Sequence, residues 1–116
     1  MVDVGSNDLL VVWTSGDREV ALKMVFMYAG NAQKQGWWEN VTMLVWGPSQ
    51  KLLAEDEELQ ERKAAMGELG VRFVACKACA DSYPVTKELE KLGVEVFYTG
   101  QFLTDWLQSD GSVVTF

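Results

Sequence analysis

The segment Leu9-Leu10-Val11-Val12-Trp13 is a continuous apolar run, and it decides the fold class. A strand with one solvated face would alternate apolar and polar residues, whereas an unbroken run is typical of a strand covered on both faces. We therefore predict a buried strand over Asp8–Thr14. The loop Ser15-Gly16-Asp17 follows it, and Asp17 can cap a helix that continues to about Gln33.

Four similar segments occur later in the chain and predict four further strands. They cover residues 41–46, 71–75, 94–98 and 112–116. Helices are predicted between them at 50–69, with a break near 54–56, at 86–92 and at 102–108. Strands that alternate with helices in this way indicate a parallel sheet with helices on both faces. We expect residues 1–116 to form a single α/β domain with three α/β/α layers and a mainly parallel sheet of about five strands.

The charge of the chain argues against nucleic acid and membrane partners. The 116 residues include 17 acidic and 10 basic side chains, which gives a net charge of -7. Binding to nucleic acid or to an anionic lipid surface requires a cationic patch, which the sequence lacks. No apolar run approaches the roughly 20 residues of a membrane span. Met1–Gly5 lacks the basic and apolar regions of a signal peptide, so we expect a cytoplasmic protein with free thiols.

The sequence contains no histidine, which narrows the possible chemistry. Ser-His-Asp and Cys-His nucleophiles, HExxH zinc sites and histidine acid–base catalysis are excluded. Catalysis here has to use cysteine, carboxylates, lysine, tyrosine or backbone groups. We expect no metal, because one CxxC pair supplies only two of the four ligands of a zinc site. We also expect no cofactor, and the chain has no GxxxxGK(S/T) phosphate loop.

The carboxyl ends of the predicted strands show where a site would form. In open α/β sheets, ligands bind outside this edge. The loops that follow four of the strands meet there. They contribute the candidate pocket-lining residues Thr14, Ser15, Gly16, Trp46, Gly47, Pro48, Ser49, Lys77 and Gly100.

Cys76 and Cys79 follow the third predicted strand and are the candidate catalytic residues. A thiolate is the reactive form, and a free cysteine has a pKa of about 8.5. Lys77, and the backbone N–H groups of a helical turn starting near Cys76, are features that lower this pKa. The three-residue spacing puts Cys79 within disulfide reach if the segment turns. The alternative is that both are small buried apolar side chains, since free cysteines are often buried.

The segment Val20–Ala29 predicts contact with another subunit. Nine of its ten residues are apolar, and Lys23 is the exception. A helix that is apolar all round must be covered on both sides. The sheet covers one side, and we expect a homo-oligomer to cover the other; the alternative is burial within one monomer. Trp37-Trp38 follows, either as part of an interface or pocket wall, or as a hydrophobic plug at the amino edge of the sheet.

Taken together, these residues show that the chain resembles the DsrE/DsrF-like family, whose members include the sulfur-relay subunits of the DsrEFH and TusBCD complexes. The resemblance extends from Leu9 to Phe116. It rests on Leu10-Val11-Val12-Trp13, Tyr28-Ala29, Trp46-Gly47-Pro48-Ser49, Gly70-Val71, Ala75-Cys76-Lys77-Ala78-Cys79-Ala80-Asp81, Gly93-Val94-Glu95-Val96, Gly100 and Leu103-Thr104.

The resemblance implies a DsrE-like doubly wound sheet, a homo- or hetero-oligomer that is often trimer- or hexamer-like, and a cysteine after the third strand. In relay members that cysteine carries sulfur as a persulfide, and by position Cys76 matches it. Cys79 falls where relay members usually have a small residue, and Asp81-Ser82-Tyr83-Pro84 replaces a basic turn. The function implied is sulfur relay to a protein thiol partner. The residues leave two alternatives open: a CxxC thiol–disulfide redox switch, and a non-catalytic oligomeric binding subunit.

Overall fold

Five parallel strands form one sheet of order β4-β3-β2-β1-β5 in the computed structural model, which describes residues 4–116. The strands are β1 (Asp8–Trp13), β2 (Asn40–Val45), β3 (Arg72–Cys76), β4 (Glu95–Phe97) and β5 (Ser112–Thr115). Their limits agree with the predicted ones to within one residue. The signal-peptide expectation concerns Met1–Gly5, of which residues 1–3 lie outside the described part.

Strand β1 is central in the sheet because its sequence can be buried on both faces. It pairs with β2 from Asp8 opposite Asn40 to Trp13 opposite Val45, and its other side pairs with β5. Leu9–Trp13 are all buried. The prediction of a parallel sheet from continuous apolar runs is therefore confirmed.

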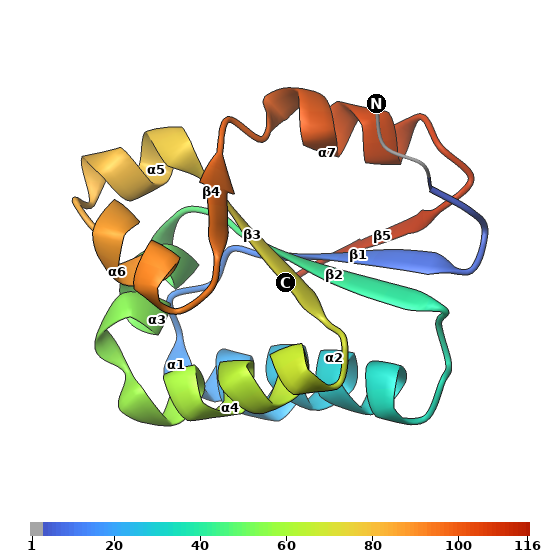
Figure 1. Cartoon of the computed structure of the whole chain (residues 1–116), viewed down its shortest axis with the longest axis horizontal. Helices are drawn as coiled ribbons and strands as arrows, with labels where there is room; N and C mark the ends of the chain where they lie inside the picture. The colour runs from blue at the N-terminus through green and yellow to red at the C-terminus, as the bar shows by residue number, and fades with distance from the viewer. Residues whose placement is uncertain (1–3) are drawn as a thin grey trace.

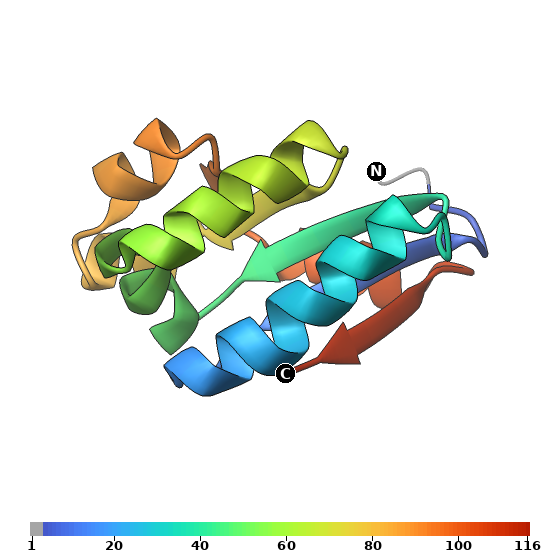
Figure 2. The same ribbon diagram turned by 90° about the horizontal axis from the view of Figure 1, so that it is seen from below.

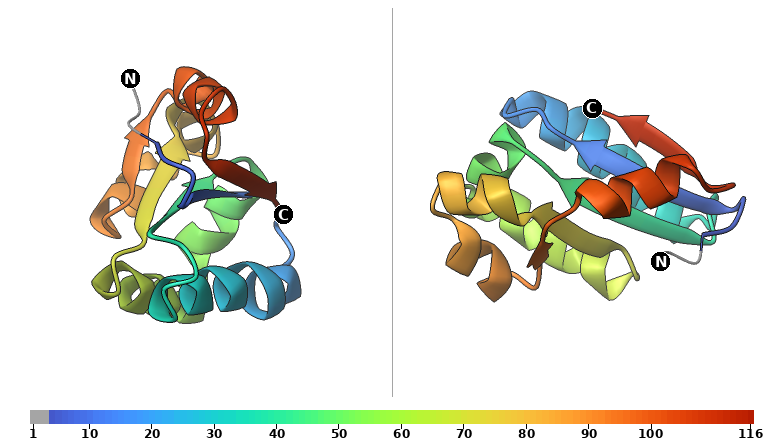
Figure 3. Two further views of the ribbon diagram at one scale, coloured as in Figure 1. Left: turned by 90° about the vertical axis from the view of Figure 1, so that its right-hand side faces the viewer. Right: turned by 90° about the horizontal axis from the view of Figure 1, so that it is seen from above.

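Helices cover both faces of the sheet and complete a three-layer α/β/α arrangement. They are α1 (Arg18–Val20), η1 (Ala21–Val25, a π-helical turn), α2 (Phe26–Lys34), α3 (Pro48–Glu55), α4 (Glu57–Glu68), α5 (Lys77–Ser82), α6 (Thr86–Lys91) and α7 (Gly100–Leu107). Helix α7 lies on one face, and α1, α2 and α4 lie on the opposite face (Figures 1 and 3). Helices α2 and α4 run side by side under the sheet (Figure 2). Within residues 4–116, no helix combines the length and the apolar character needed to cross a bilayer.

The two faces of the sheet bury separate apolar clusters. On one face, Leu10 and Val12 of β1 pack with Phe102 and Trp106 of α7. The alternate residues of the same strand belong to the larger cluster with α2 and α4: Leu9, Val11 and Trp13. Successive residues of a strand point to opposite faces, so a strand between two helical layers needs apolar side chains at every position.

Two helical segments differ from the prediction. The helix expected from Asp17 to about Gln33 begins as predicted, since the Asp17 carboxylate accepts hydrogen bonds from the backbone N–H groups of Glu19 and Val20 at 2.8 and 3.1 Å. The π-helical turn η1 then interrupts it. Helix α5 had been anticipated only as a turn near Cys76. The predicted break near 54–56 is confirmed, because Asp56 ends α3 and caps α4 through a 3.0 Å bond from the N–H of Leu59.

The fully buried side chain of Gln50 joins the carboxyl ends of β2 and β3. Its Nε2 donates to the carbonyl oxygens of Val45 and Cys76, each at 3.0 Å. Strand ends leave backbone carbonyls without ladder partners, and buried carbonyls need a donor. Gly47 makes this placement possible. Its φ of 72° lies in the left-handed region that favours glycine, and it turns the chain from β2 directly into α3.

We predict that Gln50→Leu lowers the free energy of unfolding by about 1–3 kcal/mol, because it leaves two buried carbonyls without donors. Urea denaturation followed by tryptophan fluorescence measures the change. The matched control is Lys51→Ala, an exposed position of the same helix, for which a change within about 0.5 kcal/mol is expected. Equal stability of the two variants would contradict the assigned role of the Gln50 amide.

Candidate functional site

Cys76 stands at the junction of β3 and α5. It is the last residue of β3 and occupies the N-cap position of α5, with extended backbone angles of φ -72° and ψ 120°. In the sheet it pairs with Phe97, the last residue of β4. This register brings the segment after β4, including Thr99, next to the cysteine. The predicted location of Cys76 at the carboxyl edge of the sheet is thus where the structure has it.

Hydrogen-bond donors from two elements surround the Cys76 sulfur. Burial raises the pKa of the thiol, but the donors outweigh burial and bring the pKa below its ordinary value. In order of effect, they are the backbone N–H of Cys79, the hydroxyl of Thr99, the thiol of Cys79 and the backbone N–H of Ala78. Hydrogen bonds to the charged form favour ionisation, so the reactive thiolate of Cys76 is stabilised.

Cys79 has the opposite character. Burial raises the pKa of its thiol, and the neighbouring Cys76 sulfur raises it further; the backbone N–H of Gly47 and the indole N–H of Trp46 act in the lowering direction without reversing the shift. Both cysteines are free thiols, Cys76 buried and Cys79 half-buried. The site therefore pairs one thiol whose pKa is lowered with a second whose pKa is raised, and groups of the loop after β2 act on the second.

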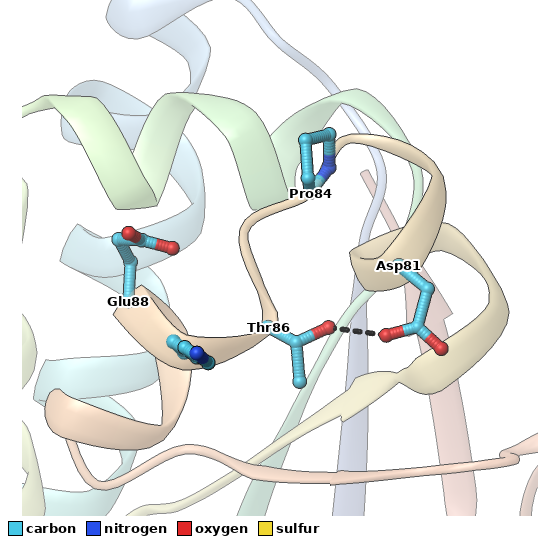
Figure 4. Close-up of a pocket in the computed structure, with 5 residues that line it drawn as sticks. Asp81, Pro84, Thr86 and Glu88 are labelled. Carbon is cyan, nitrogen blue, oxygen red and sulfur yellow. Dashed lines mark hydrogen bonds between the residues drawn. The ribbon is translucent and has the colours of Figure 1, made fainter.

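Lys77 does not act on the thiol as its sequence position had suggested. Its Nζ lies 3.0 Å from an oxygen of Asp81, and the lowered pKa of Cys76 is caused by backbone, hydroxyl and thiol donors instead. Residues four apart on a helix face each other, which directs Lys77 along α5 to Asp81. Asp81 also accepts a 2.6 Å hydrogen bond from the hydroxyl of Thr86, which links α5 to α6 (Figure 4).

A surface cavity of about 280 Å³ lies at this link between α5 and α6. It is lined by Asp81, Pro84, Thr86, Lys87 and Glu88 (Figure 4). Asp81 therefore has a structural role: its carboxylate binds Lys77 within α5 and Thr86 at the start of α6.

The remaining predicted residues after β1 and β2 hold these loops together. The Thr14 hydroxyl donates to the carbonyl of Phe116 at 2.8 Å, and the Ser15 hydroxyl accepts from the N–H of Asp17 at 3.1 Å. The buried Ser49 hydroxyl donates to the carbonyl of Trp13 and so joins α3 to the end of β1.

The loop after β1 also packs closely against the start of α3. A Cβ at Gly16 would lie 3.1 Å from the Cβ of Pro48, so the small residue allows the loop after β1 to approach α3. Gly100 begins α7 directly after Thr99. Of the predicted lining residues, Trp46 and Gly47 reach the cysteine pair, and Thr14, Ser15, Gly16, Pro48 and Ser49 hold the framework around it.

Two residues of the site were missing from the predicted set. Thr99, which is only 2% exposed, gives its hydroxyl to Cys76, and Gln50 holds the Cys76 carbonyl. The loop Thr99-Gly100 was recognised as part of the carboxyl edge, and a hydroxyl directly after a strand was the available signal. Gln50 carried no comparable signal, because glutamine in a helix is mostly exposed.

Comparison with known proteins gives structural relatives. No family model matches the sequence, and no curated protein matches it. The solved structure of a conserved protein of unknown function, BT1422 from Bacteroides thetaiotaomicron, superposes with a TM-score of 0.91 at 30% sequence identity, over 95% of each chain. The ychN protein from E. coli superposes with a TM-score of 0.70 at 17% identity, over 94% of this chain and 97% of that one.

The second likeness concerns the fold alone, and ychN has a DsrE-like fold. The five-stranded parallel sheet flanked by helices is consistent with that fold, so the expected fold is confirmed. The first likeness covers nearly all of both chains at an identity that indicates common descent. The chain therefore has a three-layer α/β/α DsrE-like fold and belongs to the same family as the conserved Bacteroides thetaiotaomicron protein BT1422.

Proposed function

We propose that this protein is a sulfur carrier that accepts sulfane sulfur on Cys76 and holds it as a persulfide. The observation that carries the proposal is the set of donors around one sulfur: two backbone N–H groups, the Thr99 hydroxyl and the Cys79 thiol. Together they lower the pKa of Cys76 against the effect of burial. The DsrE-like fold and the position of Cys76 after the third strand are compatible with this role.

The chemistry requires a thiolate and no histidine. The Cys76 thiolate attacks the outer sulfur of a donor persulfide, a new S–S bond forms on Cys76, and the donor leaves as a thiolate. Neither oxidant nor cofactor is consumed, because the sulfur atom moves together with its oxidation state. In the relay form of the proposal, the thiolate of a partner protein attacks the outer sulfur in turn and regenerates Cys76.

The position of Cys76 favours a small donor. The residue is 8% exposed, and its sulfur is bonded by groups on α5 and by Thr99. The sulfur of a low-molecular-weight persulfide can reach such a buried site more easily than a persulfide carried on the broad surface of a protein. We place this chemistry in a reducing compartment such as the cytoplasm, where thiols remain free.

We predict that Cys79→Ser protein, in which Cys76 is the sole thiol, gains the mass of one sulfur atom on exposure to glutathione persulfide. Intact-mass spectrometry after iodoacetamide trapping measures the adduct. The control is the double variant Cys76→Ser/Cys79→Ser, which has no thiol and is expected to gain none. An unmodified Cys76, or an equal gain in the control, overturns the sulfur-carrier proposal.

The opposite pKa shifts predict different pH profiles for the two thiols. Cys76 should reach half of its maximal iodoacetamide rate at lower pH than Cys79, because a lowered pKa places the thiolate at lower pH and a raised pKa delays it. Thr99→Val should slow Cys76 alkylation at neutral pH by about tenfold, the effect of losing about 1.4 kcal/mol of hydrogen bonding to a charged sulfur.

Peptide mass spectrometry resolves the alkylation rates of the two cysteines. Thr99→Ser is the matched control, since it keeps the hydroxyl and should keep the wild-type profile of Cys76. Identical profiles for wild type and Thr99→Val would show that the Thr99 hydroxyl does not stabilise the thiolate.

We further propose that the protein works as a homo-oligomer formed by the helix predicted at Val20–Ala29. Four large apolar side chains on and beside this helix are exposed and form what we call the Met–Trp patch: Met24, Met27, Tyr28 and Trp37. The rings of Tyr28 and Trp37 lie 6.0 Å apart, and the adjacent Trp38 is partly buried against the core with its indole N–H 3.0 Å from the Tyr28 hydroxyl.

The charge of the residues that line this surface is compatible with a second copy of the acidic chain. The patch borders a cavity of about 370 Å³, and Lys23 is the charged residue among those that line it. The chain as a whole carries a net charge of -7, whereas no Asp or Glu is among the residues that line this cavity, so two copies approach here with less repulsion. Methionine and aromatic side chains are enriched in interface cores. The cavity is also lined by Phe116, which follows β5, an edge strand of the sheet.

We predict that wild-type protein sediments as a multiple of its 13.0 kDa chain, and that Met27→Glu shifts it toward the monomer by placing a carboxylate in an apolar contact. Analytical ultracentrifugation at micromolar concentration measures the mass. Leu107→Glu is the control, because Leu107 is also a large exposed apolar residue but lies on α7, on the opposite face of the sheet. A monomeric wild-type protein, or equal dissociation by both variants, contradicts the assignment.

A further inference from the structure

We propose that Cys79 discharges the Cys76 persulfide within the same molecule, releasing hydrosulfide and leaving a Cys76–Cys79 disulfide. The inference rests on the proposed sulfur-carrier function and goes beyond it: it makes sulfide a product of this protein and gives the second cysteine a chemical role. It arises from two thiols of different exposure on the first turn of one short helix.

The first support is the position of the two sulfurs. Cys76 is the N-cap residue of α5, and Cys79 is the third residue of the same helix. A 2.9 Å hydrogen bond from the N–H of Tyr83 to the carbonyl oxygen of Cys79 closes the turn that holds Cys79 in α5. The side chains of the N-cap residue and of the third helical residue face each other across the first turn, as they do in a capping box. A disulfide needs Cβ atoms about 3.5–4.5 Å apart, which two side chains on the same turn reach by adjustment of one short helix.

The second support is exposure. Cys76 is buried, whereas Cys79 is half-buried and lies beside the loop after β2. A sulfur atom bound to Cys76 is therefore shielded from a bulky partner, while the thiol of Cys79 lies on the same helical turn. An intramolecular thiol acts at an effective concentration of millimolar or more, which exceeds that of any micromolar partner.

The third support is the protonation state of the pair. Burial and the adjacent Cys76 sulfur keep the pKa of Cys79 above its ordinary value, so Cys79 carries a proton at neutral pH. In the reaction, the Cys79 sulfur bonds to the Cys76 sulfur and the bond to the outer sulfur breaks. The outer sulfur leaves with the electron pair of that bond and takes the Cys79 proton, which gives hydrosulfide.

The groups around Cys79 assist this step. Hydrogen bonding from the backbone N–H of Gly47 and from the side chain of Trp46 acts to lower the pKa of Cys79, and it therefore stabilises negative charge as the proton is lost. The sulfane sulfur is reduced to sulfide while the two cysteine sulfurs are oxidised to the disulfide, so the electrons balance without an added oxidant. A second turnover requires a dithiol reductant to open the disulfide.

The test is a single turnover under anaerobic conditions with one equivalent of glutathione persulfide. Wild type, Cys79→Ser and Cys79→Ala are compared with Ser82→Ala, an exposed position of α5 that serves as the matched control. Monobromobimane measures released sulfide, and intact mass after iodoacetamide trapping distinguishes dithiol, persulfide and disulfide. The second cysteine variant separates loss of the thiol from a particular effect of the new side chain.

Wild type and Ser82→Ala should release nearly one equivalent of sulfide and end as unlabelled disulfide. Both Cys79 variants should retain the persulfide and release sulfide at least about tenfold more slowly. A wild-type persulfide that lasts as long as that of the Cys79 variants overturns the inference and leaves the sulfur-carrier function standing. Absence of the persulfide from both Cys79 variants, with no sulfide from wild type, overturns both.

Discussion

Two buried polar side chains hold the carboxyl edge of the sheet together, and the candidate site depends on them. Ser49 donates to the end of β1, and Gln50 donates to the ends of β2 and β3. Parallel strands end side by side with carbonyl groups that no further strand can satisfy. By supplying donors at these points, the first turn of α3 fixes the positions from which the loops depart, and thus the position of Cys76.

The groups that lower the pKa of Cys76 include no histidine, because the sequence contains none. Backbone N–H groups and one hydroxyl are neutral donors, so they stabilise a thiolate without adding a titrating group of their own. The same arrangement shifts the pKa values of the two neighbouring cysteines in opposite directions. Donors that include Thr99 and two N–H groups lower the pKa of Cys76, whereas burial raises the pKa of Cys79. Rates of exchange between thiols and disulfides depend on the pKa values of the attacking and leaving thiols, so this difference between the two cysteines affects their reactivity.

The fold could be predicted from the sequence because its main signal is local. Continuous apolar runs such as Leu9–Trp13 indicate strands covered on both faces, and the structure has them within one residue. The position of Cys76 followed from the same signal, since it stands at the end of such a run. Contacts between distant segments were different: Thr99 reaches Cys76 only through the β3–β4 register, which no local pattern encodes.

Lys77 shows how adjacency in sequence misleads. A neighbouring cation was expected to lower the pKa of Cys76, but consecutive residues at a helix start point in different directions, and Lys77 pairs with Asp81. The π-helical turn η1 was equally beyond prediction, because it arises inside an apolar segment that favours an ordinary helix just as well. Packing against the sheet, and not the local pattern, decides such details.

The exposed methionines of the Met–Trp patch are open to oxidation. Met24 and Met27 are about half exposed, so oxidants that consume a reactive thiolate can also reach these thioethers. Oxidation to the sulfoxide makes an apolar side chain polar and weakens an apolar contact, and methionine sulfoxide reductases reverse it. Assembly through this patch would then respond to oxidative damage at the surface, independently of the state of the two cysteines.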